Sequence, residues 1–136
     1  MDQNKKKILL FENSIFLLEI YYSALIAADY EVITADNLES CMLIAAEKPN
    51  LILIDIMTPR INGLEVLACL KDDNQTKDVP VVVLATTGQE KIIAEIIKMG
   101  ARGFLLKDHL TPKDLVLRIN DFLEESKLTE EQQNSI

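Results

Sequence analysis

The apolar residues of this chain fall into five short runs, which are separated by longer stretches with helical spacing. Several of the runs are nearly continuous in Ile, Leu and Val, as is typical of strands that are covered on both faces of a parallel sheet. We therefore predict five buried parallel strands, at residues 8–11, 31–35, 51–54, 81–85 and 103–106.

The stretches between the runs place apolar residues three or four positions apart, which predicts one apolar stripe on each of five helices. These helices are expected at residues 14–28, 37–48, 64–71, 89–99 and 112–123. Gly100 follows the fourth stretch, where a left-handed residue often ends a helix, and Thr111-Pro112 begins the fifth as an N-cap with proline at the first helical position. The alternation predicts an α/β fold of (βα)₅ type with a doubly wound parallel five-stranded sheet. We expect one domain over residues 1–126, followed by a loose polar tail over 127–136.

Charge and cysteine content exclude several classes of protein. The chain has 14 Lys and Arg against 22 Asp and Glu, a formal charge of −8, which disfavours nucleic-acid binding and a polybasic membrane anchor. Cys41 and Cys69 lack zinc-site spacing, and His109 is the only histidine. The first apolar run is too short for a signal-peptide core, and no segment reaches the length of a membrane span. We expect a cytoplasmic protein with neither nucleic acid nor membrane as a partner.

Candidate chemistry lies where the predicted strands end, because open parallel sheets bind ligands beyond the carboxyl ends of their strands. Glu12 and Asn13 follow the first strand, Asp55 the third, Thr86 the fourth and Lys107 the fifth. Hard oxygen ligands of this kind suit Mg²⁺, and a nearby lysine suits a phosphoryl group. A glycine-rich nucleotide loop is absent from the sequence. This set predicts phosphoryl transfer to an aspartate that acts as the nucleophile.

Two segments resemble response-regulator receiver domains of the CheY-like type. Residues 55–63, Asp-Ile-Met-Thr-Pro-Arg-Ile-Asn-Gly, are similar to the phosphoacceptor loop of that family, and residues 103–108, Gly-Phe-Leu-Leu-Lys-Asp, resemble its fifth strand with the functional lysine. The resemblance extends over residues 7–123. It implies a flavodoxin-like receiver fold and a role in two-component signal transduction, with no enzyme activity beyond phosphoryl transfer to the chain's own aspartate.

The resemblance also implies roles for single residues. Asp55 corresponds to the aspartate that is phosphorylated by a histidine kinase or a histidine phosphotransfer protein. Lys107 would pair with Asp55 and then with the phosphoryl oxygens. Phe104 corresponds to the switch aromatic, which turns inward on activation. The implied Mg²⁺ ligands are Glu12, Asn13, Asp55 and the backbone carbonyl of Met57.

Two positions depart from the family pattern. Asn13 stands where a second aspartate is usual, and one unit charge at about 4 Å is worth about 4 kcal/mol at an effective dielectric of about 20, so Mg²⁺ affinity should fall. Ala85 stands where the switch Thr or Ser is usual and removes a charge-assisted hydrogen bond of about 1.5–3 kcal/mol. Thr86 or Thr87 could replace it only after a backbone shift, because adjacent side chains on a strand point to opposite faces. A phosphorylation-independent pseudo-receiver that acts through protein contacts is the alternative.

Two surfaces are expected to bind partners. The first helix is too apolar for all of its side chains to face the sheet, and Phe16 is a candidate contact for the phosphodonor. The fourth helix, fifth strand and fifth helix would contact an effector or a second copy of the chain. We expect no DNA-binding segment after Leu123. A flavin-binding protein of similar topology would need a hydroxyl-rich loop where Glu12 and Asn13 stand, and an aspartyl-phosphate hydrolase would need an aspartate at Met57.

Overall fold

The computed structural model describes residues 4–56, 62–86 and 90–134 and contains one five-stranded parallel sheet. The strand order is β2-β1-β3-β4-β5, which is the order of the doubly wound flavodoxin-like fold and confirms the predicted fold class. Each strand begins and ends within one residue of its predicted position. The strands are β1 (Lys7–Phe11), β2 (Glu31–Thr34), β3 (Leu51–Asp55), β4 (Val81–Ala85) and β5 (Gly103–Leu106).

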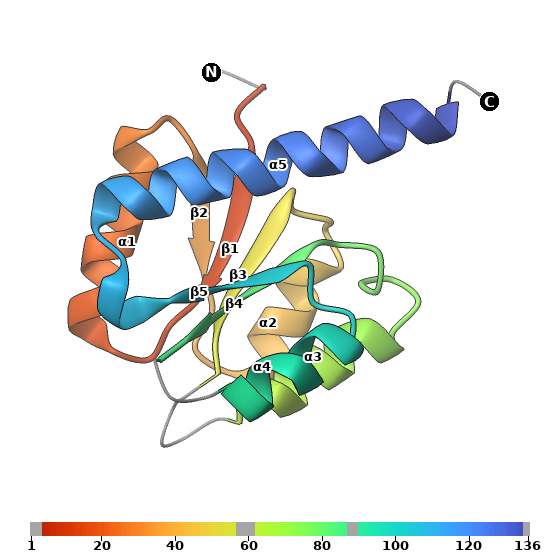
Figure 1. Ribbon diagram of the computed structural model, residues 1–136, viewed down its shortest axis with the longest axis horizontal. Coiled ribbons are helices and arrows are strands. Elements are labelled where there is room, and N and C mark those ends of the chain that lie inside the picture. Colours follow the sequence, from red (N-terminus) through yellow and green to blue (C-terminus); the bar gives the residue numbers. More distant parts are fainter. Residues whose placement is uncertain (1–3, 57–61, 87–89, 135–136) are drawn as a thin grey trace.

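Five α-helices cover the two faces of this sheet, with α1 and α5 on one face and α2, α3 and α4 on the other (Figure 1). They are α1 (Ile15–Ala27), α2 (Leu38–Ala45), α3 (Gly63–Asp72), α4 (Glu90–Lys98) and α5 (Pro112–Asn134), and a short 3₁₀ helix, η1 (Lys107–His109), precedes α5. Among the described residues, no helix is both long enough and apolar enough to cross a membrane.

The core consists of two apolar layers that the strands supply in alternation. Leu51 and Leu53 of β3 pack toward α1 and α5, whereas Ile52 and Ile54 pack toward α2, α3 and α4. Because successive side chains of a strand point to opposite faces, a strand that is covered on both sides needs an unbroken apolar run. This requirement explains the continuous Ile, Leu and Val runs of the sequence.

Two predicted helix ends are confirmed. Gly100 follows α4 with φ +106°, a left-handed conformation that glycine adopts without steric cost. At the start of α5 the Asp114 amide donates to the Thr111 hydroxyl over 3.0 Å, and the Thr111 amide donates to the Asp114 carboxylate over 3.3 Å. These reciprocal bonds satisfy two amides that a helix start leaves unpaired.

The expected loose tail is wrong for most of its length, because α5 continues to Asn134. Figure 1 shows this helix running past the edge of the sheet. The prediction ended the helix where its apolar stripe ends. The following residues are mainly Glu, Gln, Lys and Leu, which favour helix even without an apolar stripe, and they include no Gly or Pro. The domain boundary at residue 126 stays a prediction.

Candidate functional site

Three charged side chains meet beyond the carboxyl ends of the strands. Glu12 follows β1, Asp55 ends β3 and Lys107 follows β5. The Lys107 Nζ lies 2.9 Å from Asp55 Oδ2 and 3.1–3.2 Å from the two carboxylate oxygens of Glu12. The structure therefore brings together the three charged residues that the sequence analysis placed in one site. β1 and β3 are adjacent at the point where the strand order reverses, which is where open α/β sheets bind ligands.

Both carboxylates of the site are almost fully buried. Glu12 is 3% exposed and Asp55 is 2% exposed. Burial of like charges is unfavourable unless a cation lies close by, and Lys107 supplies that cation. The pKa of Glu12 is raised from 4.5 to about 7, first by burial and then by the hydrogen bond and charge of Asp55, whereas the Ser14 amide and Lys107 act in the opposite direction. Near pH 7, the Glu12 carboxyl is therefore divided between its protonated and ionised forms.

A glycine places the start of α3 directly against the end of β3. A Cβ atom on Gly63 would lie 2.4 Å from the Ile56 Cα and 2.7 Å from the Asp55 carbonyl oxygen, distances that only a shift of the backbone could relieve. The Asn62 side chain caps the same helix by accepting from the Leu64 amide over 3.0 Å. The glycine that closes the predicted phosphoacceptor segment is thus required by the packing of that segment.

The donor set fits a divalent cation such as Mg²⁺. Glu12 Oε2 is buried, and apart from the nearby ammonium it has no hydrogen-bond donor among the described residues. Mg²⁺ is commonly bound by one or two carboxylates and retains several waters. Within the described part of the chain, no third His, Cys, Asp or Glu side chain joins Glu12 and Asp55 to form a cluster. Asn13 is half-buried beside Glu12, whereas Met57 lies outside the described residues.

The predicted switch residues lie at the adjacent strands. Ala85 ends β4, is fully buried and pairs with Leu106 of β5. Phe104 is half-buried and packs against the apolar layer to which Ala85 belongs. Thr86 is exposed just beyond the strand, and Thr87 lies outside the described residues. A hydroxyl is therefore absent from the buried end of β4, as the sequence indicated.

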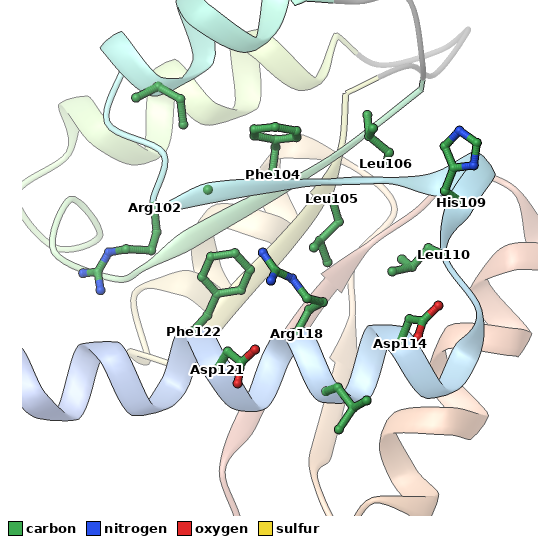
Figure 2. Close-up of a pocket in the computed structure, with 13 residues that line it drawn as sticks. Arg102, Phe104, Leu105, Leu106, His109, Leu110, Asp114, Arg118, Asp121 and Phe122 are labelled. Carbon is green, nitrogen blue, oxygen red and sulfur yellow. The ribbon is translucent and has the colours of Figure 1, made fainter.

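A groove runs along β5 and is closed by α5 on one side (Figure 2). Its volume is about 800 Å³. Figure 2 shows Phe104 and Leu106 on one side of the strand, with Leu105 and Phe122 on the side of α5. A Cβ atom on Gly103 would lie 2.6 Å from the Phe122 ring, so this glycine leaves room for the ring. The charged residues of the groove are Arg102, Asp114, Arg118 and Asp121.

The outer face of α1 exposes large apolar side chains, as predicted. Ile15 is 75% exposed and Phe16 is 73% exposed, and they are the first two residues of α1, shortly after Glu12 and Asn13. Tyr21 on the same helix is buried instead, and the charges of Glu12 and Asp55 reach its hydroxyl. Tyr21 is not among the predicted site residues, because the apolar pattern of α1 does not show which of its side chains is buried next to the charged groups.

Comparison with known proteins assigns this arrangement to a family. Residues 8–120 match the response regulator receiver domain. The chain belongs to this family. Its sequence is 33% identical to the phosphate regulon transcriptional regulatory protein PhoB of Pseudomonas aeruginosa, over 87% of this chain and 52% of that protein. It is 32% identical to the probable transcriptional regulator ycf27 of Cyanophora paradoxa, over 90% of this chain and 50% of that protein.

The solved structures give the same assignment. The chemotaxis response regulator CheY4 of Vibrio cholerae superposes with a TM-score of 0.78 at 25% identity, over 88% of this chain and 99% of that one. The receiver domain described here spans about half the length of the curated relatives above. The family confirms the resemblance seen in the two motifs and places the chain among two-component signalling proteins rather than classical enzymes. Response regulators of this family interact with histidine kinases and effector domains, and receiver domains generally bind Mg²⁺ at their acidic site.

Proposed function

We propose that this receiver domain accepts a phosphoryl group on Asp55 from a histidine kinase or a histidine phosphotransfer protein, with Mg²⁺, and signals through protein contacts. The observation that carries the proposal is the 2.9 Å ion pair between Asp55 and Lys107 in a buried site that Glu12 shares. A carboxylate beside a cation suits nucleophilic attack on a phosphoryl group, and a second carboxylate beside it can help to bind Mg²⁺.

The chemistry follows from the charges of the site. A carboxylate oxygen of Asp55 attacks the phosphorus of a phosphohistidine, so that a P–O bond forms while the P–N bond breaks and its electron pair stays on the imidazole. Lys107 stabilises the phosphoryl oxygens of the resulting acyl phosphate, because its ammonium already lies against Asp55. Mg²⁺, held by Glu12, Asn13, Asp55 and the Met57 carbonyl, would supply further neutralisation of phosphoryl charge.

A labelling experiment tests this proposal directly. The protein is incubated with acetyl phosphate, with and without Mg²⁺, and its intact mass is measured. We expect the mass of one added phosphoryl group when Mg²⁺ is present, and no addition in the Asp55→Asn variant. Asp36→Asn is the matched control, because Asp36 is an exposed aspartate before α2 and its loss should not affect labelling. A wild-type protein that stays unlabelled where another receiver domain is labelled would refute phosphorylation on Asp55.

The exposed apolar face of α1, which is defined here by Ile15 and Phe16, is the proposed docking site of the phosphodonor. Phe16→Ala should slow transfer from a phosphohistidine protein but leave labelling by acetyl phosphate unchanged, because only the first reaction needs docking. Leu43→Ala is the matched control, since Leu43 is 67% exposed on α2, on the other side of the sheet. Equal rates of protein-to-protein transfer in the two variants would contradict this assignment.

The face formed by α4, β5 and α5 is the proposed contact for an effector or a second copy of the chain. Its groove combines apolar walls with both signs of charge, from Arg102 and Arg118 against Asp114 and Asp121. A surface of this composition favours a protein partner over a nucleic acid.

A pseudo-receiver that is not phosphorylated is the second candidate function. Two observations favour it: Asn13 in place of an acidic ligand, and the buried methyl group of Ala85 where a hydroxyl would be needed for switching. The labelling experiment separates the two candidates, because a pseudo-receiver keeps its unmodified mass.

A further inference from the structure

Tyr21 is an unusual residue within the apolar layer between the sheet and α1 and α5. Its side chain is 2% exposed and lies in the apolar cluster that contains Leu10, Leu53 and Leu84. Its hydroxyl is buried and has no hydrogen-bond partner among the described residues. A buried hydroxyl without a partner is destabilising, and phenylalanine would fill the same space without that penalty. The presence of this hydroxyl therefore requires an explanation.

The position of Tyr21 on α1 favours a side chain that extends toward the acidic site. Long side chains of a helix point back toward the helix N-terminus, and the N-terminus of α1 directly follows Glu12 and Asn13. The hydroxyl also lies within the electrostatic field of the site. Its pKa is raised to about 12, first by burial and then by the charges of Glu12 and Asp55.

Two further buried polar atoms belong to the residues that follow β1. Asn13 Nδ2 has no hydrogen-bond partner in the described part of the chain, and Glu12 Oε2 has only the Lys107 ammonium, 3.1 Å away. Together with the Tyr21 hydroxyl they comprise an acceptor, a donor and a group that can act as either. Water can satisfy such a mixed set, because it both donates and accepts hydrogen bonds, whereas an apolar ligand or a bare anion cannot.

We propose that Tyr21 is a positioning residue of the acidic site, and that its hydroxyl hydrogen-bonds the water shell of the divalent cation held by Glu12 and Asp55. The inference rests on the proposed function, because it requires that these carboxylates bind Mg²⁺. Tyr21 then links occupancy of the site to α1, the helix whose outer face carries Ile15 and Phe16.

The test uses the Tyr21→Phe variant, which removes only the hydroxyl. Thermal unfolding midpoints are measured at increasing concentrations of MgCl₂, and the apparent Kd is obtained from the dependence of the midpoint on metal concentration. We expect the apparent Kd for Mg²⁺ to rise about tenfold, which is the usual effect of losing an outer hydrogen-bonding partner of a metal site. Without metal, the midpoint of Tyr21→Phe should equal or exceed that of the wild type, because an unpartnered hydroxyl has been removed.

Tyr22→Phe is the matched control, because Tyr22 is the neighbouring tyrosine on α1 and is 42% exposed. This variant should keep the wild-type Kd. An unchanged Kd in Tyr21→Phe would overturn the inference. So would a midpoint that falls equally with and without Mg²⁺, because that result shows a purely structural role for the hydroxyl.

Failure of this inference is distinguishable from failure of the proposed function. If the wild type binds Mg²⁺ and is labelled on Asp55 while Tyr21→Phe keeps the wild-type Kd, only the inference fails. If MgCl₂ does not shift the midpoint of the wild type, the metal-dependent function and the inference fail together.

Discussion

The ends of β3 and β4 lie side by side in the sheet, yet they carry very different side chains. β3 ends in Asp55, which pairs with Lys107 and lies close to Glu12. β4 ends in Ala85, whose methyl group belongs to the apolar layer between the sheet and α2, α3 and α4. Both positions are buried, with 2% and 0% of the residue exposed.

This difference separates two requirements of a phosphorylated receiver. The end of β3 has the charged groups that the proposed phosphoryl acceptance needs, although buried carboxylates destabilise the fold unless they are paired. The end of β4 has apolar packing where the family pattern places a hydroxyl that senses the phosphoryl group, and this packing stabilises the fold. If Asp55 is the acceptor, as proposed, we expect substitutions at these adjacent strands to change acceptance and sensing separately.

The largest expected effect comes from removing the cation at the end of β3. Lys107→Met leaves Glu12 and Asp55 buried without a positive partner, so the free energy of unfolding should fall by about 3–5 kcal/mol at pH 8. The loss should be smaller at pH 5, where Glu12 takes up a proton. Urea unfolding at the two pH values measures both quantities.

The control for this prediction is the same substitution in an Asp55→Asn background. One buried charge is then already removed, so Lys107→Met should cost less stability there than in the wild type. Lys98→Met on the exposed surface of α4 should have little effect in either background. Equal losses from Lys107→Met in both backgrounds would show that the ion pair with Asp55 does not stabilise the end of β3.

The second prediction concerns the dependence of stability on pH, and it applies only to the charged site at the end of β3. The pKa of Glu12 is raised from 4.5 to about 7 in the folded protein, so between these values the folded state binds a proton that the unfolded state has released. Without metal, stability should therefore fall as pH rises from about 4.5 to about 7, by roughly 2–3 kcal/mol, and then level off. Urea unfolding across this range measures the slope.

Glu12→Gln should remove most of this slope, because the amide does not titrate. Saturating Mg²⁺ should also flatten it, since a bound cation favours the ionised carboxylate. If the pH dependence of stability persists in Glu12→Gln, a group other than Glu12 causes it. Ala85 at the end of β4 has no titratable group and cannot be the cause.

Much of the charged site at the end of β3 could be predicted from the sequence. The apolar runs place Glu12, Asp55 and Lys107 at the ends of parallel strands, and the ends of parallel strands meet at one edge of a sheet. The absence of a hydroxyl at Ala85 is likewise a direct consequence of residue identity. What the sequence could not show is burial, which sets the pKa of Glu12 and makes Lys107 necessary.

Other features depend on contacts between segments that are distant in the chain. The sequence shows Gly103 only as a residue of a strand, and the structure shows that the Phe122 ring packs against it. In the sequence, Tyr21 is one of many apolar residues of α1, and periodicity does not reveal that its hydroxyl is buried without a partner and within reach of the charges of Glu12 and Asp55. The length of α5 was underestimated because the prediction followed the apolar stripe, whereas helix propensity extends the helix beyond it.

The third prediction adds charge to the acidic site. Asn13→Asp provides a further carboxylate beside Glu12, and affinity for Mg²⁺ should rise by roughly tenfold to hundredfold, because solvent recovers only part of the Coulomb energy. Without metal the variant should be less stable, since three acidic groups then share one lysine. Thermal midpoints at increasing MgCl₂ concentration measure both effects. Asn74→Asp, in the exposed loop after α3, is the matched control, and an equal gain in that variant would exclude a local effect.

The smallest expected effect tests the end of β4 itself, with Ala85→Thr and Ala85→Val as a matched pair. Both side chains are larger than alanine at a fully buried position, so both variants should lose stability through overpacking. The two differ only by a hydroxyl in place of a methyl group. In the unphosphorylated protein that hydroxyl lies in an apolar layer, which should make the threonine variant the less stable of the two.

Phosphorylation of Asp55 should narrow the difference between these variants by about 1.5 kcal/mol, the lower end of the range for a charge-assisted hydrogen bond, because the threonine hydroxyl can then donate to a phosphoryl oxygen and the valine methyl cannot. Thermal midpoints before and after treatment with acetyl phosphate and Mg²⁺ measure the change. A difference that phosphorylation leaves unaltered would mean that the end of β4 cannot sense the end of β3 even when the hydroxyl is present. The backbone at the edge of the sheet, and not the identity of residue 85, would then prevent the end of β4 from responding to a phosphoryl group on Asp55.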